Sequence, residues 1–349
     1  MASDFMEHPL TTLIKRDYKK TMKKISMKKA MPLAALISLR IFALIIMRSL
    51  LFSGLFLSGL VSSGLFSSGL YAASNDAQPF LWKIQSRYST VYLAGSIHAL
   101  NDDYYPLANS YLSAFNQADK LVLELNIDNI NPAKAQALVK YKTWLPTERS
   151  LEEYLNQEEL TLLRHYAKQA GLTYATLIRM RPWMVIETLT GYQLRQSNFN
   201  TGKGVDQYFL TMAKEKKMPI LELESLEQQI NAMADAPFAS QLAALSLSLK
   251  QMEDNSYLTT MADYWQQGDN QGLYNFVYQD MQNYPAIKPM MIKLLDDRNR
   301  NMTDIIGIYL ATHQTYFIVV GALHLSGPQS ILAMLENKGY KIEKVTSPN

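Results

Sequence analysis

The chain has 349 residues, of which 48% are hydrophobic and none is cysteine, and its formal net charge is +3. A chain of this length can bury a sizeable core, and the lack of cysteine excludes disulfides and thiol chemistry. Residues 1–74 hold ten basic and three acidic residues, whereas the remainder holds 24 basic and 28 acidic ones. We therefore exclude nucleic acid as a partner, because the part expected to fold is mildly acidic.

Residues 1–74 have the organisation of a targeting segment. Basic residues up to Arg48 precede an apolar stretch that repeats Ser-Gly-Leu every five residues and ends in small residues at 71–74. This order is typical of a secretory signal, but the uncharged run 49–73 could also anchor the chain in an inner membrane if it is retained. Both alternatives stay open. In either case we expect residues 75–349 to form a domain in the periplasm or another extracytoplasmic space, with membrane contact only through the N-terminal segment.

From residue 78 onward the hydrophobic pattern predicts one α/β domain. The expected elements, in chain order, are a hairpin at 79–85 and 89–95 with its first strand at the sheet edge, a helix at 106–118, a strand at 120–126, helices within 132–195, an amphipathic helix at 204–218, a strand at 219–225, helices within 225–283, a helix at about 289–312, a strand at 316–321, a helix at 328–339 and a strand at 341–345. Strands and helices alternate around a helical middle. This order predicts a central mixed β-sheet with flanking helices and a helical insertion or lid.

The pattern Gly-x-x-His occurs twice, each time directly after a strand-like run. The first copy is Gly95 to His98 and the second is Gly321 to His324. We expect each glycine to let the backbone turn away from the strand end. Each histidine then lies just past the C-terminal end of a buried strand, where α/β sheets build their sites. Two histidines that each follow a buried strand and lie at one sheet edge predict a shared site.

Carboxylates stand at comparable positions. Glu124 follows an aliphatic strand, and Glu222 and Glu224 close another. A carboxylate in an apolar strand is costly to bury unless it is paired or bound to a metal, so we expect Glu124 to be functional. Glu222 is interpreted as an edge residue, and the role of Glu224 is open. The other histidines repeat no such context and are interpreted as lying outside the site: His8, His165 and His313.

Two neutral imidazoles and a carboxylate can hold a divalent metal ion with a position left open for water. Such an ion would activate that water for hydrolysis, while a second carboxylate takes its proton and an arginine stabilises the oxyanion. Without metal, the same residues could carry out general acid–base hydrolysis. The patterns H-E-x-x-H and G-x-S-x-G are absent, which excludes a common zincin and a serine hydrolase.

Several segments resemble, in the same order, the TraB/PrgY/GumN family, and most closely its GumN-type branch. They are GSIH at 95–98, LVLELN around Glu124, 204–213, 221–229, 296–302 and 319–345, so the similarity covers essentially all of residues 78–345. This family is related to the Tiki metalloproteases. The resemblance implies an α/β fold of the kind shared with erythromycin esterase and the haem-uptake protein ChaN.

The resemblance also implies roles for individual residues. His98 and His324 would be metal ligands or acid–base residues, Glu124 a ligand or base, and Glu224 and Arg298 further catalytic residues. The metal would be manganese or cobalt, with zinc as an alternative. Asp206, which follows Gly204 at the start of an amphipathic run, is interpreted as a helix cap rather than a site residue.

Two functions therefore remain. The first is an extracytoplasmic, metal-dependent hydrolase, similar to a peptidase or amidase, that acts on a peptide or small-molecule substrate. The second is a non-catalytic protein of the same fold that binds a peptide, haem or an iron-containing ligand. A carboxylate and an arginine beside two histidines favour the enzyme, because a binding protein has no need of them.

Overall fold

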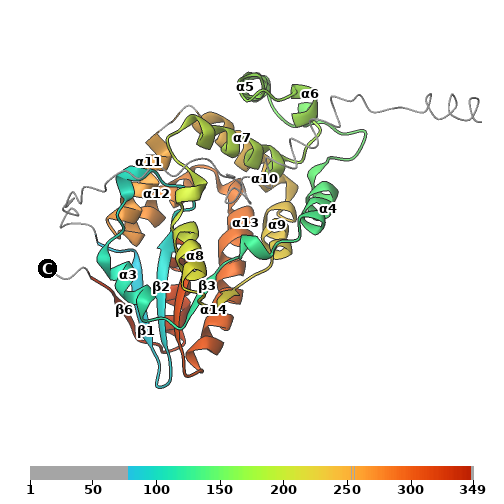
Figure 1. Ribbon diagram of the computed structural model, residues 1–349. Helices are drawn as coiled ribbons and strands as arrows, with labels where there is room; N and C mark the ends of the chain where they lie inside the picture. Colours follow the sequence, from blue (N-terminus) through green and yellow to red (C-terminus); the bar gives the residue numbers. More distant parts are fainter. Residues whose placement is uncertain (1–77, 253, 255, 347–349) are drawn as a thin grey trace, which may run out of the picture. The chain divides into compact units, whose positions relative to one another are not determined.

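The computed structural model describes residues 78–346 except 253 and 255. Its strands form a six-stranded sheet in the order β4-β3-β5-β2-β1-β6 (Figure 1). The strands are β1 (Leu81–Gln85), β2 (Thr90–Ser96), β3 (Lys120–Leu123), β4 (Ile220–Glu222), β5 (Thr315–Gly321) and β6 (Ile342–Lys344). β1 is antiparallel to β2 and β6, and the other neighbours are parallel, so the sheet is mixed as predicted.

The expected position of the first strand is wrong. β1 and β2 form the predicted hairpin, but β1 does not lie at the sheet edge. β6 pairs with the other side of β1, with Trp82 opposite Lys344, and is itself the edge strand. The physical reason is that β1 is buried at most positions and needs a neighbour on each side, whereas the short β6 is largely exposed.

The helices lie near their predicted positions. They are α3 (Asn109–Asn116), α4 (Pro132–Thr143), α5 (Gln157–Gln169), α6 (Tyr174–Leu177), α7 (Pro182–Gln196), α8 (Val205–Glu215), α9 (Leu226–Ala234), α10 (Phe238–Gln251), α11 (Ser256–Gln266), α12 (Asn270–Asn283), α13 (Lys288–Met291), α14 (Asp297–Leu310) and α15 (Ile331–Asn337). The single helix expected at about 289–312 is instead α13 and α14 joined by a π-helical turn, Ile292–Asp296. Such turns are rare and often lie at functional sites.

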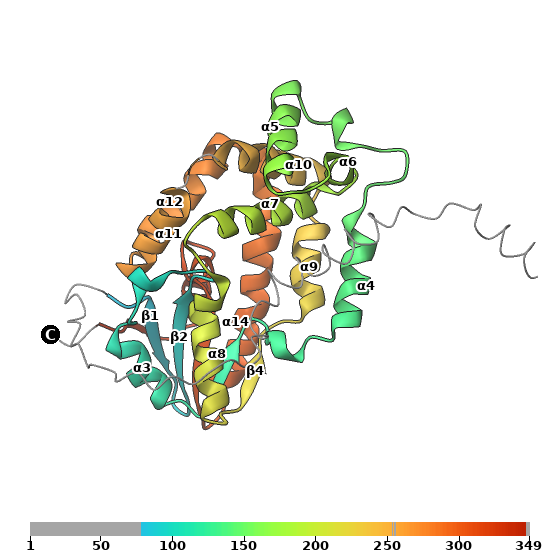
Figure 2. The same ribbon diagram turned by 45° about the horizontal axis from the view of Figure 1, so that its top comes forward.

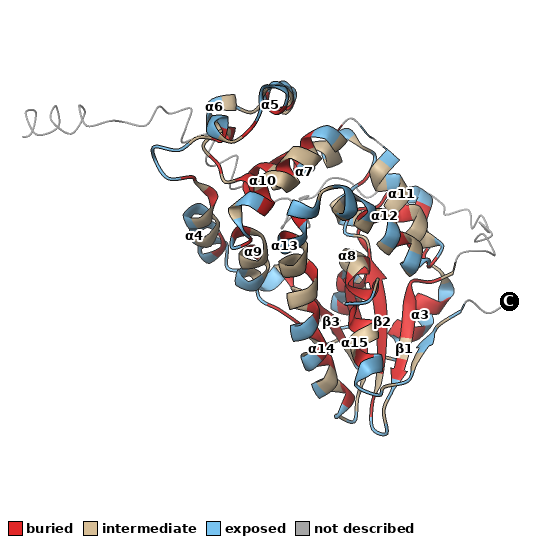
Figure 3. Ribbon diagram, turned by 180° about the vertical axis from the view of Figure 1, so that it is seen from behind, coloured by how far each residue is buried: buried red, intermediate tan, exposed pale blue. Residues whose placement is uncertain are grey.

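The core lies on both faces of the two central strands, β2 and β5, which are buried along almost their whole length (Figure 3). On one face the ring of Phe317 in β5 packs against Phe115 of α3 and Phe209 of α8, with ring centroids 5.5 and 4.6 Å apart. α14 contacts β2 and α15, and covers the sheet from the other side. This packing fixes the level at which the two central strands end.

The helical middle of the chain lies beyond the C-terminal ends of the parallel strands, as the predicted insertion or lid would. Figure 2 shows α4, α7, α9 and α10 on that side of the sheet. α7 packs along α10, and α9 along α4. Within the described part of the chain, no helix is both long enough and apolar enough to cross a membrane. The predicted targeting segment 1–74 and the run 49–73 lie outside the described residues.

Candidate active site

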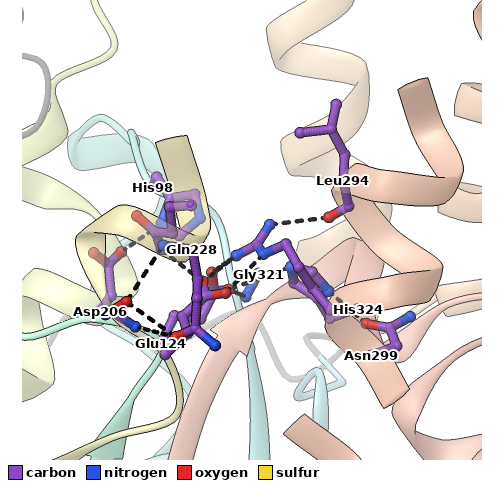
Figure 4. Close-up of polar contacts among 12 residues, drawn as sticks. His98, Glu124, Asp206, Gln228, Leu294, Asn299, Gly321 and His324 are labelled. Carbon is purple, nitrogen blue, oxygen red and sulfur yellow. Dashed lines mark hydrogen bonds and ion pairs between the residues drawn. The ribbon is translucent and has the colours of Figure 1, made fainter. Parts of the chain in front are cut away.

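The predicted site residues follow three neighbouring strands. β2 and β5 pair in parallel with Ser96 opposite Gly321, so His98 and His324 leave the sheet side by side. β3 lies on the other side of β5, and Glu124 comes directly after its last residue. Figure 4 shows His98, Glu124 and His324 gathered around Gly321. The structure therefore brings the three side chains to one edge of the sheet.

The two motif glycines allow side chains to approach the strand ends closely. Neither has a positive φ, and that of Gly321 is −52°. A methyl group on Gly95 would overlap the ring of Phe80. A methyl group on Gly321 would lie 3.3 Å from Oε1 of Glu124 and 3.4 Å from Nε2 of His98. The chain leaves β5 at Gly321, which precedes the turn Ala322–Leu325, whereas Gly95 still lies within β2. Each glycine also leaves room for side chains that pack against the strand end.

Asn299 determines which nitrogen of His324 carries the hydrogen. Its Nδ2 donates to the backbone oxygen of Gln329 at 2.7 Å, so its Oδ1 must face the histidine. Nδ1 of His324 lies 2.5 Å from this oxygen and donates to it, which leaves Nε2 as an acceptor. Burial lowers the pKa of His324 to about 4. The ring is therefore neutral at neutral pH.

Glu124 is a buried carboxylate held by two donors. Its Oε1 accepts the backbone N–H of Gly321 at 2.5 Å, and its Oε2 accepts Nη2 of Arg298 at 2.5 Å. Desolvation alone would raise the pKa of Glu124. The interaction with His324 once that ring is protonated in acid, the charges of Arg298 and His98, and the hydrogen bond from Gly321 outweigh it and hold the pKa of Glu124 well below its usual range. Glu124 is therefore ionised.

Arg298 links Glu124 to a second buried carboxylate, Glu224. Its Nε donates to Oε2 of Glu224 at 2.9 Å, and its Nη2 donates to both carboxylates. Its Nη1 donates to the backbone oxygen of Leu294, in the π-helical turn, at 3.0 Å. Burial raises the pKa of Glu224 above its ordinary value despite these bonds and a further one from Gln229. Arg298 thus supplies positive charge to both carboxylates and fixes their orientation.

His98 lies on the solvent side of the site and pairs with Asp206. Its Nδ1 is 3.2 Å from Oδ1 of Asp206, and 63% of its side chain is exposed. Desolvation opposes protonation, but the charge and hydrogen bond of Asp206 raise the pKa of His98 above its ordinary value. Because solvent screens this pair, we assign it little stability. The two histidines thus differ in environment, a pattern that separates acid from base roles in enzymes.

The prediction that Asp206 caps a helix is wrong. The N-cap of α8 is Gly204, and no side chain caps this end. A methyl group on Gly204 would lie 2.5 Å from the backbone oxygen of His98, so glycine is needed for the helix to begin there. The N–H of Val205 then donates to the backbone oxygen of Ile97 at 3.1 Å. These contacts place Asp206, one residue further on, beside the imidazole.

Two acceptors face each other at the centre of the site. Nε2 of His324 and Oε1 of Glu124 are 3.7 Å apart, in side chains that are 4% and 9% exposed. Neither atom carries a hydrogen, so they cannot bond to each other. A group placed between them must supply a proton or positive charge, as a water molecule, a substrate N–H or a metal ion would.

The types of donor fit a divalent metal ion. His98 and His324 each bond another side chain through Nδ1 and leave Nε2 free, as metal-binding histidines do. As the side chains stand, however, no three His, Asp or Glu residues in the described part of the chain are grouped closely enough to hold a metal ion.

Other residues were missed or had minor roles in the sequence-based prediction. The sequence-based prediction missed Asn299, although its position next to Arg298 in the same helical turn could have pointed to it.

Glu222 accepts the backbone N–H of Asn126 at 2.9 Å and so fixes the segment that follows Glu124. His165 and His313 are exposed, as expected of surface residues.

Comparisons with known proteins identify the family of this chain. The TraB/PrgY/gumN family matches residues 80–344, and the chain belongs to this family. It is similar to the uncharacterized protein YbaP of Escherichia coli (strain K12), with 26% identity over 249 residues, which cover 70% of this chain and 87% of that protein. The match to the protein of the same name from Shigella flexneri has the same extent. No solved structure matches the chain significantly.

Proposed function

We propose that the protein hydrolyses peptide or amide bonds at the site formed by His98, Glu124 and His324, with a divalent metal ion as cofactor. The observation that carries the proposal is the pair of facing acceptors, Nε2 of His324 and Oε1 of Glu124. Membership of the family supports it. We include in the proposal the relation to the Tiki metalloproteases and the fold shared with erythromycin esterase and ChaN, which the motifs imply.

In this proposal His98, Glu124 and His324 hold the metal ion, with manganese, cobalt or zinc as candidates. When bound, such an ion lowers the pKa of a water molecule and polarises a carbonyl group. Neutral His324 offers the lone pair of Nε2 as a ligand, because Asn299 holds its Nδ1–H. Glu224, whose pKa is raised by burial, is our candidate for the proton acceptor.

Arg298 has a supporting role in this chemistry. It keeps Glu124 ionised and fixes the direction of its carboxylate. Three of its nitrogens already donate to Glu224, Glu124 and the backbone of Leu294. One N–H of Nη1 has no partner among the described residues and is available to a developing oxyanion.

We further propose that the domain acts outside the cytoplasm. The order of basic, apolar and small residues in 1–74 supports export by a signal peptide or retention by a membrane anchor.

The proposal is tested with the purified full-length chain. After removal of bound metal, it is incubated with Mn²⁺, Co²⁺ or Zn²⁺ and a mixture of unlabelled peptides, and products are identified by mass spectrometry. We expect cleavage that requires metal, falls at least about 100-fold in His324→Ala and His98→Ala, and is unchanged in His165→Ala. Bound metal, measured by elemental analysis, should fall in the first two variants only.

Activity that persists in both site variants would overturn the proposal. Binding without cleavage would instead support the second interpretation, in which the protein binds a peptide, haem or an iron-containing ligand without catalysis. Titration with haem followed by absorption near its Soret band identifies that outcome directly.

A further inference from the structure

A groove of about 720 Å³ lies beside the candidate active site. One wall is the face of α12 that carries Tyr274, Tyr278 and Gln279, and the other is formed by α13, the π-helical turn and residues 328–329. A volume of this size is typical of sites that bind small molecules or short polymer segments.

The groove is polar but carries little net charge. Among the described residues that line it, one is acidic and one is basic, Asp296 and Lys288. The rest of the polar lining consists of side-chain amides and phenols. Burial, together with Asp296 and Tyr274, raises the pKa of Tyr278 to about 12, so its hydroxyl is a neutral donor. Because the acid and the base offset each other, the groove has no net charge to attract a charged ligand, whereas its amides and phenols offer donors and acceptors to a neutral polar ligand.

The amides form a row along one helix face. Asn275, Gln279 and Gln282 follow each other at intervals of about one turn and line the groove together. The row extends over about 10 Å at 1.5 Å per residue. This is roughly the length of three residues of an extended peptide. The side chains of Gln279 and Gln282 have no partner among the described residues, so their donors and acceptors are available.

The aromatic rings favour a peptide over a sugar. The rings of Tyr274 and Tyr278 stack on each other, with centroids 3.9 Å apart and planes 29° apart. Tyr274 also packs closely over Gly327, where φ is +82° and a methyl group would overlap the ring. Tyr278 therefore covers one face of Tyr274, and Gly327 lies against the same ring, which makes Tyr274 a poor platform for a sugar ring. Met281, Pro285 and Pro328 lie beside the amide row and can contact the side chains of a peptide.

The groove and the site share structural elements. Asn299 bonds His324 through Oδ1 and the backbone of Gln329, a groove residue, through Nδ2. Asp296 lies two residues before Arg298, at the end of the π-helical turn. The groove therefore shares Gln329 and the π-helical turn with the residues that orient His324 and Glu124.

We infer that this groove is the subsite that holds an uncharged, extended segment of a peptide substrate next to the bond to be cleaved. This inference rests on the proposed hydrolase function but concerns binding, and it is tested separately. Gln279 and Gln282 bond the peptide backbone, and the apolar residues beside them contact its side chains. Charged residues in this segment of the peptide are disfavoured.

The test uses the purified full-length chain and a pool of fluorescein-labelled peptides of eight uncharged residues. Binding is followed by fluorescence anisotropy. We expect the double variant Gln279→Ala/Gln282→Ala to bind at least about 10-fold more weakly than the wild type. Both side chains are exposed, so the fold should be retained, which circular dichroism verifies. The control is Gln157→Ala, an exposed glutamine on α5, which should bind like the wild type.

A second measurement varies the peptide. Replacing two central residues by glutamate or by lysine should weaken binding about 10-fold in each case. If cleavage is observed, the double variant should raise KM and leave kcat unchanged.

Several results would overturn the inference: no binding of any peptide in the pool, equal binding by the double variant, or displacement of the peptide by maltohexaose or chitohexaose through the same two glutamines. Cleavage that depends on His324 but not on Gln279 and Gln282 would refute the peptide-binding role of the groove and leave the hydrolase proposal standing. Peptide binding that depends on the two glutamines, without cleavage, would refute the hydrolase proposal and leave the peptide-binding role of the groove standing.

Discussion

At the scale of single residues, Arg298 is the centre of the candidate site. It bonds two buried carboxylates, Glu124 and Glu224, and a backbone oxygen of its own helix. Two carboxylates so close would repel each other, and one of them would be protonated without the guanidinium between them. Lysine could not replace this residue, because its single ammonium cannot bond both carboxylates with the same planar geometry.

We predict that Arg298→Met destabilises the protein by about 3–5 kcal/mol, because it leaves two buried carboxylates unpaired. The loss should be smaller at pH 4 than at pH 8, since protonation of a carboxylate relieves it. Urea unfolding at both pH values measures the effect. Arg300→Met is the control: Arg300 lies in the same helix but pairs with Asp297 at the surface, so it should change stability by at most about 1 kcal/mol. Equal effects of the two substitutions would contradict this account of Arg298.

At the scale of secondary structure, the site depends on where elements begin and end. β2 and β5 end opposite each other, at Ser96 and Gly321, and β3 ends two residues earlier in the register, opposite Val319. α8 begins near these ends because Gly204 admits the backbone of His98. The π-helical turn before α14 contains Leu294, whose backbone oxygen holds Arg298. Strand ends thus supply the reactive side chains, and helix starts supply the residues that orient them.

Gly321→Ala tests the close approach at the end of β5. The added methyl group would lie 3.3 Å from Glu124 and 3.4 Å from His98, so these side chains must shift. We expect hydrolytic activity to fall about 10-fold or more, a change of about 1.4 kcal/mol in the barrier, with a loss of stability of about 1–2 kcal/mol. Activity and thermal unfolding are measured on the same preparation.

Gly307→Ala is the matched control. Gly307 lies within α14, and a methyl group there would meet no atom within 4 Å. Alanine at this position should stabilise the helix by about 0.5–1 kcal/mol and leave activity unchanged. Wild-type activity in Gly321→Ala would show that the strand end is not part of the site.

At the scale of the whole molecule, stability should depend on a partly buried acid outside the site. Glu187 lies in α7 and has no hydrogen bond or ion pair with any described residue. Burial raises the pKa of Glu187 to about 7. The folded protein therefore binds more protons than the unfolded chain between about pH 4.5 and pH 7, so this residue makes stability fall as pH rises through that window.

We predict that Glu187→Gln has nearly wild-type stability at pH 4.5 and is more stable than the wild type by about 2–3 kcal/mol at pH 8. Urea unfolding across this pH range is the measurement. Glu158→Gln, an exposed acid on α5, is the control and should have no such pH dependence. A constant difference between Glu187→Gln and the wild type at all pH values would contradict the assigned cause.

Much of this molecule could be predicted from local sequence patterns. The hairpin, the parallel strand before His324 and the helical insertion follow from hydrophobic period and from turn residues, which act over a few positions. The neighbouring positions of His98, Glu124 and His324 followed from one rule, that residues after buried parallel strands meet at one edge. The roles of these residues, the metal and the export of the chain stay predictions.

Other features could not be read from the sequence, because they depend on contacts between distant segments. Asp206 has the sequence context of a helix cap, and only the contact between Gly204 and the backbone of His98 turns it toward the imidazole. Asn299 is one polar residue among many until Gln329 fixes its amide. The edge position of β6 likewise depends on a pairing between strands far apart in the chain.

The sequence by itself determined which residue types reach the sheet edge, because the alternation of strand and helix and the repeated Gly-x-x-His are local properties of the chain. The tertiary structure alone decided their chemical states. Burial makes His324 neutral, Asp206 raises the pKa of His98, and Arg298 keeps Glu124 ionised. The physical reason is that desolvation and charge–charge interaction depend on distances in space, which a sequence does not contain.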